Sequence, residues 1–248
     1  MTSREDRGIV SILQMDHGKA NALDIELLQT LANEISGLPA GVRALVLTGR
    51  EQIFSAGLDL PALIEADSGY TFELIDALND LLEIFVELSM PTVAAINGHA
   101  IAGGFVLAAA CDVRVMANGR GKVGLTEHLV GVPFPPLALE VVRTAVGDRQ
   151  TRRMVMGAEL FSDSAAAEQG LVDELSAPED LLERAVEIAE RLGAVPRSAF
   201  ELSKRQLMVP LRMRLAHLGA HHEQLARQVW VDPATVDVMR RFVRDRLS

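Results

Sequence analysis

Cysteine is nearly absent from this sequence, with Cys111 the single one among 248 residues. One cysteine cannot form an intramolecular disulfide, and it cannot supply a zinc or iron–sulfur site built from several thiolates. The six histidines include no HExxH pair. His221 and His222 are adjacent, so on a helix their rings would point about 100° apart. We therefore expect no metal site, and we interpret Cys111 as a buried packing thiol.

Aromatic residues make up only 4% of the chain, with one Trp and one Tyr, and the formal net charge is −10. Proteins that bind nucleic acid usually carry a basic surface and rings that stack on bases, so we expect no nucleic-acid partner. The charge is uneven, because residues 201–248 hold nine Lys or Arg but five Asp or Glu. This basic region could face an anionic ligand, although solvated helix faces are the simpler interpretation.

Long apolar runs are also missing. The first ten residues, MTSREDRGIV, mix both charges and lack an apolar stretch, so they are unlike a signal or transit peptide. Residues 92–111 carry little charge, but a polar turn at residues 97–99 and the pair Gly103–Gly104 interrupt them. We expect a strand, a turn and a helix there rather than a membrane span, and a cytoplasmic protein with no membrane partner.

Short β-type runs alternate with helical patterns along the chain, which indicates the α/β fold class. Apolar, β-branched runs predict strands at residues 9–13, 44–48, 92–96, 113–116 and 171–174. Apolar residues at helical spacing predict helices at residues 25–35, 72–88, 105–110, 164–169, 181–192, 199–208, 210–230 and 234–247. The pattern divides the chain into an α/β core, residues 1–195, and a helical C-terminal region, residues 196–248.

Two glycine-bearing turns follow predicted strands. The first is FSAGLDL at residues 54–60, and the second is NGHAIAGG at residues 97–104, which opens a helix. Free backbone N–H groups at such positions suit a phosphate or a developing oxyanion. The sequence lacks the lysine and hydroxyl of a P-loop, a GxGxxG fingerprint, and a GxSxG elbow at Ser55. Backbone donors without an adjacent nucleophile favour oxyanion stabilisation.

A third segment, VGLTEHLVGVPF at residues 123–134, places Glu127 in apolar surroundings before a turn rich in Gly and Pro. A carboxyl group in such a pocket has a raised pKa and makes a useful base near neutral pH. A Glu that caps a helix or forms a salt bridge fits this segment equally well.

Together these segments resemble the crotonase superfamily, which includes the enoyl-CoA hydratases and isomerases. GKANAL at residues 18–23 is similar to the family's loop on the adenine side of CoA, and residues 54–60 are similar to its first oxyanion segment. Residues 96–114 are similar to the second oxyanion segment, and GLVD at residues 170–173 matches a later strand. The resemblance covers nearly the whole chain. It implies a crotonase-like spiral of ββα turns with a helical C-terminal part, assembled as a homotrimer or homohexamer.

The resemblance also implies roles for individual residues. The N–H groups of Leu58 and Gly103 would point at the thioester oxygen of an acyl-CoA, and Glu127 would be an acid/base. Coenzyme A would then be part of the substrate, with no permanently bound cofactor. The residues expected to bind it are Lys19, Ala20, Ala22, Ala56, Gly57, Asp59, Leu60 and Gly104. Lys204 and Arg205 could reach its phosphates, including those bound to a neighbouring subunit.

The sequence departs from the hydratases of this family at Val106, where they carry a second Glu three residues after the oxyanion glycine. Hydration usually needs two carboxylates to position water, whereas a shift of the double bond from C3 to C2 needs one base. We therefore favour Δ3-Δ2 enoyl-CoA isomerisation in fatty acid metabolism, with Glu127 as the single acid/base. The alternatives are a 2-enoyl-CoA hydratase with an atypical second acid, such as Glu73 or Glu83, and a non-catalytic CoA-binding scaffold.

Overall fold

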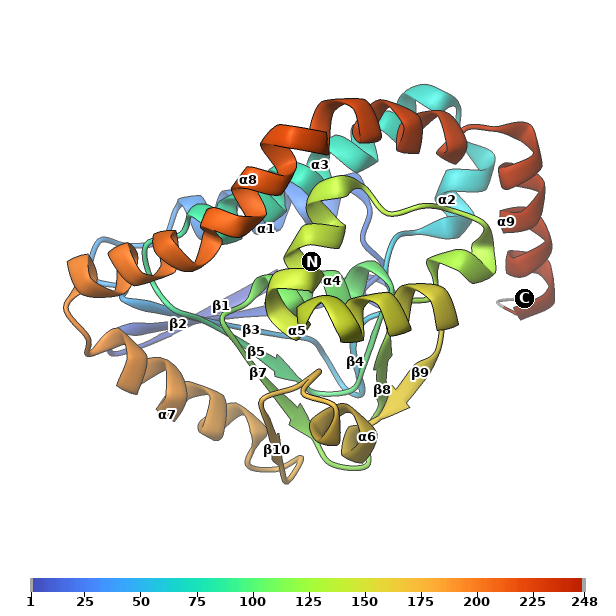
Figure 1. Cartoon of the computed structure of the whole chain (residues 1–248). Coiled ribbons are helices and arrows are strands. Elements are labelled where there is room, and N and C mark those ends of the chain that lie inside the picture. Colours follow the sequence, from blue (N-terminus) through green and yellow to red (C-terminus); the bar gives the residue numbers. More distant parts are fainter. Residues whose placement is uncertain (1, 247–248) are drawn as a thin grey trace.

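The computed structural model describes residues 2–246 and contains two β-sheets enclosed by helices (Figure 1). Within these residues the larger sheet has six strands in the order β1-β2-β3-β5-β7-β10. Their bounds are β1 Thr2–Arg7, β2 Val10–Met15, β3 Ala44–Thr48, β5 Thr92–Ile96, β7 Val113–Ala117 and β10 Glu174–Ser176. β1 and β2 form an antiparallel hairpin, and all other neighbours in this sheet are parallel.

The smaller sheet is built mainly from strands that each follow a strand of the larger sheet along the chain. Its order is β4-β6-β8-β9, with bounds β4 Ile53–Ser55, β6 His99–Ile101, β8 Lys122–Gly124 and β9 Leu160–Ser162. β4, β6 and β8 run parallel, while β9 is antiparallel to β8. The chain thus repeats a strand of the large sheet, a strand of the small sheet and a helix, which confirms the expected spiral of ββα turns.

Helices cover both faces of the larger sheet (Figure 1). The helix α7 (Leu181–Gly193) covers one face, where Ala185 and Ile188 pack with Val46 and Val93. The other face is covered by α1 Ile25–Ser36, α3 Ser68–Glu87, α4 Gly103–Ala110 and α5 Pro136–Gly157. Strands such as β3 are buried at every position because both of their faces contact a core.

Two helices form the C-terminal part, α8 (Arg197–Trp230) and α9 (Pro233–Arg246). α8 is continuous, so the prediction of two helices separated at Pro210 is wrong. Proline removes the hydrogen bond to the carbonyl four residues earlier. That residue, Gln206, is exposed, so water can replace the missing donor, and buried Leu211 holds the helix against the core. The predicted end of the last helix, Leu247, lies outside the described residues.

Other elements differ from the sequence-based expectation for local reasons. β1 was not expected because its sequence, TSREDR, is almost wholly polar, and it lies at an edge of the sheet. α3 begins earlier than expected because Asp67 caps it, accepting a hydrogen bond from Tyr70 N at 3.0 Å. Residues 171–173 do not form the expected strand. The first two of their amides donate instead to the carbonyl of Ala166 in the helix α6 (Asp163–Glu168).

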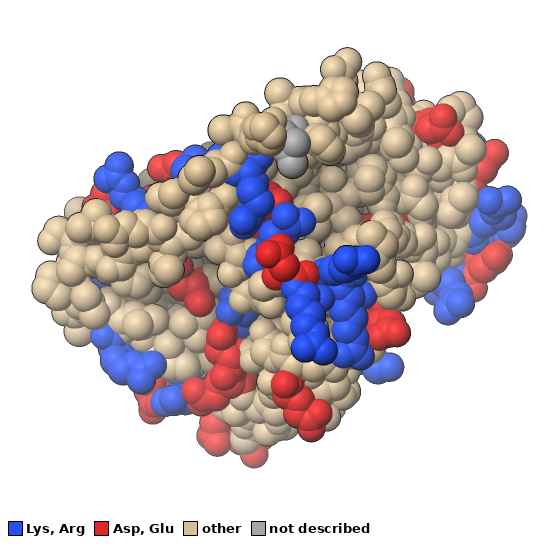
Figure 2. Space-filling view, viewed as in Figure 1, with Lys and Arg blue, Asp and Glu red and all other residues tan. Residues whose placement is uncertain are grey.

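The basic C-terminal helices pair with acidic helices instead of forming a separate basic surface. Arg212 of α8 pairs with Glu83 and Glu87 of α3, and Arg227 pairs with Asp76 of the same helix. On the face seen in Figure 2, basic and acidic side chains are interspersed. The uneven charge along the sequence is therefore largely balanced by the fold.

Candidate active site

The three segments singled out in the sequence meet at one edge of the smaller sheet. β4, β6 and β8 are parallel neighbours, so their carboxyl ends lie side by side. Leu58, Gly103 and Glu127 each follow one of these strands within three residues. The amide of Ala102 donates to the carbonyl of Gly124 at 2.8 Å, which ties the ends of β6 and β8 together. Ligands of α/β proteins commonly bind at the carboxyl ends of parallel strands, so this edge is the candidate active site.

Two unpaired backbone N–H groups lie close together at this edge. A Cβ atom built on Gly103 would lie 3.5 Å from Leu58 N, and one built on Gly57 would lie 3.1 Å from Gly103 N. The amides on either side of Leu58 are occupied, since Gly57 N donates to Ser55 Oγ and Asp59 N donates to a carbonyl of the preceding loop. Among residues 2–246, neither Leu58 N–H nor Gly103 N–H has a hydrogen-bond partner. Two such donors can bind one oxygen atom, as in an oxyanion hole.

Glycine permits the two turns to approach each other. Gly57 has a φ of +92°, and a Cβ atom on Gly104 would lie 2.2 Å from the carbonyl oxygen of Ser55. Any larger residue at position 104 would therefore push the start of α4 away from the end of β4. Ala102 takes the conformation φ +53°, ψ −125°, which is rare outside glycine and marks a constrained turn directly before Gly103. The amino end of α4 adds the positive end of its dipole.

Glu127 begins the short 3-10 helix η1 (Glu127–Val130) and is 8% exposed. Its Oε2 atom is buried without a hydrogen-bond partner in the described part of the chain. Burial raises the pKa of this carboxyl to about 8, against smaller lowering contributions from its own backbone and that of Thr126. Its environment is therefore the apolar one that the sequence indicated. A group with this pKa can take up or release a proton near neutral pH.

The carboxyl of Glu127 differs from the other buried carboxyl in the described residues. Glu140 is equally buried, but it pairs with Arg143 and Arg214. Glu127 has no ion pair among residues 2–246, so it is not the salt-bridged Glu that its segment alone also allowed. No cation among these residues therefore stabilises its ionised form, which agrees with its raised pKa.

Within residues 2–246, the position on α4 expected to carry a second acid near Gly103 is apolar. Val106, one turn further along α4, is 1% exposed and apolar. Of the two acids considered as substitutes, Glu73 is exposed, and Glu83 lies 3.6 Å from Arg212 in an ion pair. Neither of them shares the enclosed setting of Glu127.

The loop at residues 16–22 lies directly against the first of the two turns. Ala56 N donates to Ala20 O at 3.0 Å, which joins the loop to the turn. Asn21 is fully buried with a φ of +45°. Its side-chain nitrogen donates to three carbonyls, those of Met15, Ile53 and Phe54. The loop expected to hold CoA is therefore fixed to the segment expected to hold the thioester.

The residues expected to bind substrate fall into three groups by exposure. Lys19 and Ala56 are exposed, and Gly57 and Gly104 are buried. The half-buried residues are Ala20, Ala22, Leu58, Asp59 and Leu60. Asp59 also caps the helix α2 (Leu60–Glu65), where its side chain accepts a hydrogen bond from Ala62 N at 3.0 Å. Gly57, Asp59 and Gly104 are chain neighbours of the two unpaired amides, and the contacts of all these residues with substrate stay predictions.

The expectation for Lys204 is wrong for this chain. Lys204 is 5% exposed, and its Nζ lies 3.1 Å from Asp112 Oδ2, so it is a buried ion-pair partner unable to reach phosphates in solvent. Arg205 is exposed and pairs with Glu201. The sequence could not separate these neighbours, because position along the helix decides which one faces the core.

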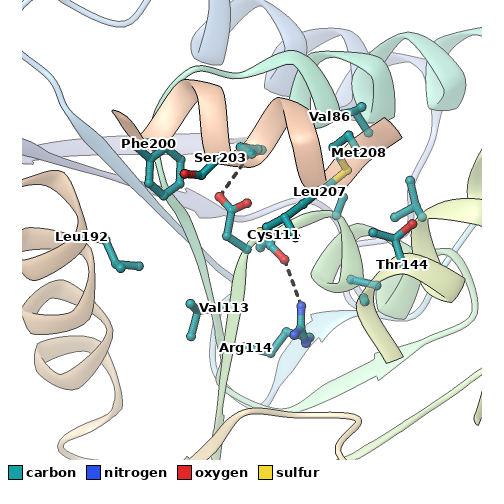
Figure 3. Close-up of a pocket in the computed structure, with 16 residues that line it drawn as sticks. Val86, Cys111, Val113, Arg114, Thr144, Leu192, Phe200, Ser203, Leu207 and Met208 are labelled. Carbon is teal, nitrogen blue, oxygen red and sulfur yellow. Dashed lines mark hydrogen bonds and ion pairs between the residues drawn. The ribbon is translucent and has the colours of Figure 1, made fainter. Parts of the chain in front are cut away.

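A pocket of about 410 Å³ lies at the carboxyl end of α4, next to Cys111 (Figure 3). Lys204 also lines this pocket. Cys111, Phe200 and Met208 line it, so α4 separates it from the two unpaired amides. Cys111 is 2% exposed, and burial raises the pKa of its thiol to about 12, which confirms a packing role.

The helix α9 packs against both sides of the candidate site (Figure 1). A Cβ atom on Gly131, directly after η1, would lie 3.3 Å from Val238 of α9. Arg240 of α9 donates to the carbonyl of Ile64 in α2, at 3.4 Å. The C-terminal helix therefore joins the element that carries Glu127 to the element that follows Leu58.

Two negative findings apply to residues 2–246. No group of three or more His, Cys, Asp or Glu side chains is placed to hold a metal ion. No helix within this range combines the length and apolarity that crossing a membrane requires.

Sequence reasoning missed the two polar residues that organise the first turn. Ser55 and Asn21 are both fully buried. Ser55 Oγ donates to Asn21 O at 2.7 Å and accepts from Gly57 N at 3.1 Å. The available signal was a small polar residue flanked by apolar residues in each of the two motifs, since buried polar groups are normally hydrogen-bonded.

Comparison with known proteins agrees with this geometry. Residues 4–243 match the model of the enoyl-CoA hydratase/isomerase family. A Thermus thermophilus protein named as an enoyl-CoA hydratase is 34% identical over 82% of this chain and 82% of its own length. The mouse mitochondrial enoyl-CoA delta isomerase 1 is 29% identical over 80% of this chain and 70% of its own length.

A solved structure supports the fold. The crystal structure of human mitochondrial delta3-delta2-enoyl-CoA isomerase matches with a TM-score of 0.92 at 23% identity, covering 98% of this chain and 97% of that one. The match extends over the helical C-terminal part as well as the sheets, so the two proteins share one fold. The chain belongs to the enoyl-CoA hydratase/isomerase family and is an enzyme of the crotonase type.

Proposed function

We propose that the protein converts 3-enoyl-CoA thioesters to 2-enoyl-CoA thioesters, with Glu127 as the single acid/base. The observation that carries this proposal is the isolation of Glu127. It is the one buried carboxyl without an ion pair among residues 2–246, and Val106 occupies the position of a second acid. A one-base reaction fits such a site better than a reaction that needs two carboxylates.

The reaction follows from the positions of the donors and the base. The thioester oxygen accepts hydrogen bonds from Leu58 N–H and Gly103 N–H, which stabilises the negative charge that develops when C2 loses a proton. Each donor contributes about 2.7–4 kcal/mol if it acts like other oxyanion donors. Ionised Glu127 takes the C2 proton, and the resulting dienolate receives it back at C4. The double bond thereby moves from C3 to C2, and Glu127 returns to its ionised state.

The acyl-CoA substrate would enter along the loop that precedes α1. Ala20 and Ala22 are half-buried beside the first turn, and Lys19 is exposed where a phosphate or the adenine end could lie. CoA is thus bound as part of the substrate and leaves with the product.

The experiment is to incubate the protein with 3-enoyl-CoA and 2-enoyl-CoA panels and identify the products by mass and ultraviolet spectra. The proposal expects a product of unchanged mass with the absorbance of a conjugated thioester. A product 18 Da heavier from 2-enoyl-CoA, formed rapidly, would favour hydration instead.

Hydration is the second candidate because one 34% identical relative is named as a hydratase. The one-base mechanism predicts that the missing carboxylate limits hydration, so Val106→Glu should raise the hydration rate about a hundredfold, roughly the lower bound for a positioned acid/base. Val106→Ala, which changes packing without adding an acid, is the control. A wild-type protein that already hydrates as fast as Val106→Glu would contradict the one-base mechanism.

The third possibility, a CoA-binding scaffold without activity, differs in its exchange chemistry. A scaffold would bind acyl-CoA without exchanging the C2 hydrogen with solvent deuterium. The unpaired buried carboxyl of Glu127 argues against a scaffold, because an unused buried acid lowers stability without a compensating contact.

We further propose that the protein assembles from copies of the same chain through α8. Apolar side chains on this helix remain in solvent, with Leu202, Leu207, Val209 and Met213 between 49% and 69% exposed. Four large apolar side chains on one helix are expected at a subunit contact. A homotrimer or homohexamer would cover them.

A further inference from the structure

We propose that Ser55 is a positioning residue, whose hydroxyl aims the Leu58 N–H at the thioester oxygen. The inference rests on the proposed role of that N–H and assigns its orientation to a side chain outside the expected substrate contacts. Ser55 is the last residue of β4 and is fully buried, so its hydroxyl acts only on neighbouring protein groups.

The hydroxyl of Ser55 bridges two backbone segments. It donates to the carbonyl of Asn21 at 2.7 Å and accepts from Gly57 N–H at 3.1 Å. Asn21 belongs to the loop before α1, while Gly57 begins the turn that carries Leu58. This side chain therefore adds to the backbone hydrogen bond from Ala56 N to Ala20 O in fixing the separation between this loop and this turn.

The direction of the Leu58 N–H depends on the same turn. Gly57 O accepts a hydrogen bond from Leu23 N at 2.8 Å. In a planar trans peptide the C=O and N–H point in opposite directions, so the Leu58 N–H points away from Leu23. The turn has Gly57 at a φ of +92°, a region that only glycine enters easily. Because glycine has little rotational restraint of its own, its orientation depends on two hydrogen bonds, one from Leu23 N to its carbonyl and one from its own N–H to Ser55 Oγ.

The loop that accepts the hydrogen bond from Ser55 is held firmly by Asn21. Asn21 is fully buried, and its side chain donates to three backbone carbonyls and accepts from His17 N at 2.7 Å. The Asn21 carbonyl, which accepts the hydrogen bond from Ser55 Oγ, is therefore held in place. Ser55 thus hydrogen-bonds both the glycine turn and this held loop.

Ser55 also touches the second donor segment. A Cβ atom on Gly104 would lie 2.2 Å from Ser55 O and 2.9 Å from Ser55 Cβ, so α4 begins against this residue. Ser55 is consequently in contact with both turns that carry the unpaired amides. Its position sets how far the Leu58 N–H lies from the Gly103 N–H.

The hydrogen bonds exclude a nucleophilic role for this serine. Both of its hydrogen-bonding functions are directed at backbone groups, and no His, Lys or carboxylate contacts its oxygen among the described residues. A nucleophilic serine needs a base within hydrogen-bond reach. Its contribution is therefore geometric.

The test compares Ser55→Ala with Ser11→Ala. Ser11 is a matched control, because it is also fully buried and also donates one hydrogen bond of 2.7 Å, to Asp6, but lies on β2 away from the site. Three quantities are measured on each variant: kcat and KM with 3-enoyl-CoA, the thermal midpoint, and the carbonyl stretching frequency of a bound ¹³C-labelled acyl-CoA. Hydrogen bonds to a carbonyl lower that frequency, so the band reports directly on the two donors.

We expect Ser55→Ala to lower kcat about tenfold to a hundredfold, somewhat less than the loss of an entire oxyanion donor. KM should change little, and the carbonyl band should move back toward its frequency in water. Ser11→Ala should lower the thermal midpoint similarly while leaving kcat and the band unchanged. If Ser55→Ala does not fold, Ser55→Cys, which keeps a weaker donor and acceptor, should show the same changes to a smaller extent.

The inference is overturned if the Ser55 variant keeps the wild-type carbonyl frequency and the kcat of the Ser11 variant. It is also overturned if the wild-type protein binds acyl-CoA with no shift of the band. If the wild-type protein shifts the band but does not isomerise 3-enoyl-CoA, the proposed reaction fails. Loss of the shift in Ser55→Ala would then still support the positioning role.

Discussion

Replacing Glu127 by Gln should abolish most of the activity and at the same time stabilise the protein. Gln has nearly the same shape but cannot accept a proton from C2. A general base typically contributes about 10²–10⁴ in rate. The upper part of this range is expected here, because Val106 offers no substitute and Glu140 is held by Arg143 and Arg214.

The stability change follows from the raised pKa of Glu127. Burial raises the folded-state pKa of this carboxyl to about 8, from the ordinary value of 4.5. Between these values the folded chain binds a proton that the unfolded chain releases, so the wild-type protein loses stability as the pH rises. At pH 7 the loss amounts to about 3 kcal/mol. Gln does not titrate, so its free energy of unfolding should not change through this group. The stability of the variant relative to the wild type should therefore increase from pH 4.5 upward, with no difference at lower pH.

The assay combines kcat/KM between pH 6 and 9 with denaturant unfolding over the same range. Wild-type kcat/KM should rise with pH and level off above about 8, where Glu127 is ionised. Glu140→Gln is the control, because it removes a buried ion pair and should lower stability without lowering kcat. Retained turnover in Glu127→Gln, or a stability difference independent of pH, would refute the reasoning.

Two further substitutions test other parts of the site and its assembly. Gly104→Ala places a Cβ atom 2.2 Å from Ser55 O and should destabilise the protein by several kcal/mol, roughly the cost of overpacking or more, as seen in thermal unfolding. Wild-type stability in this variant would mean that α4 and β4 are less tightly packed than described. Met213→Glu puts a charge among the exposed apolar side chains of α8 and should shift the assembly toward monomers in light scattering. An unchanged mass would place the subunit contact elsewhere.

The sequence was sufficient for the repeating architecture and for the segments that form the site. Buried parallel strands such as β3 are apolar at nearly every position, and this pattern is visible without coordinates. The glycines of the two turns signalled a close backbone approach, which the contacts of Gly57 and Gly104 confirm. The burial of Glu127 was also indicated, because the segment at residues 123–134 is mostly apolar.

The remaining features depend on contacts between distant segments. Pro210 predicted a break, but the solvent exposure of Gln206 and the packing of Leu211 allow α8 to continue. The sequence indicated an exposed cation at Lys204, whereas the structure pairs this side chain with Asp112. The hydrogen bond from Ser55 Oγ to Asn21 O could not be predicted, because it joins two segments that are more than thirty residues apart in sequence and meet at the end of β4.

The transfer of one proton within a single turnover tests the central claim most directly. A 3-enoyl-CoA carrying deuterium at C2 should yield 2-enoyl-CoA with part of that deuterium at C4, because one enclosed carboxyl removes the label and returns it. Mass spectrometry and nuclear magnetic resonance of the product would locate the label. Turnover that yields 2-enoyl-CoA with no deuterium at C4 would contradict the account.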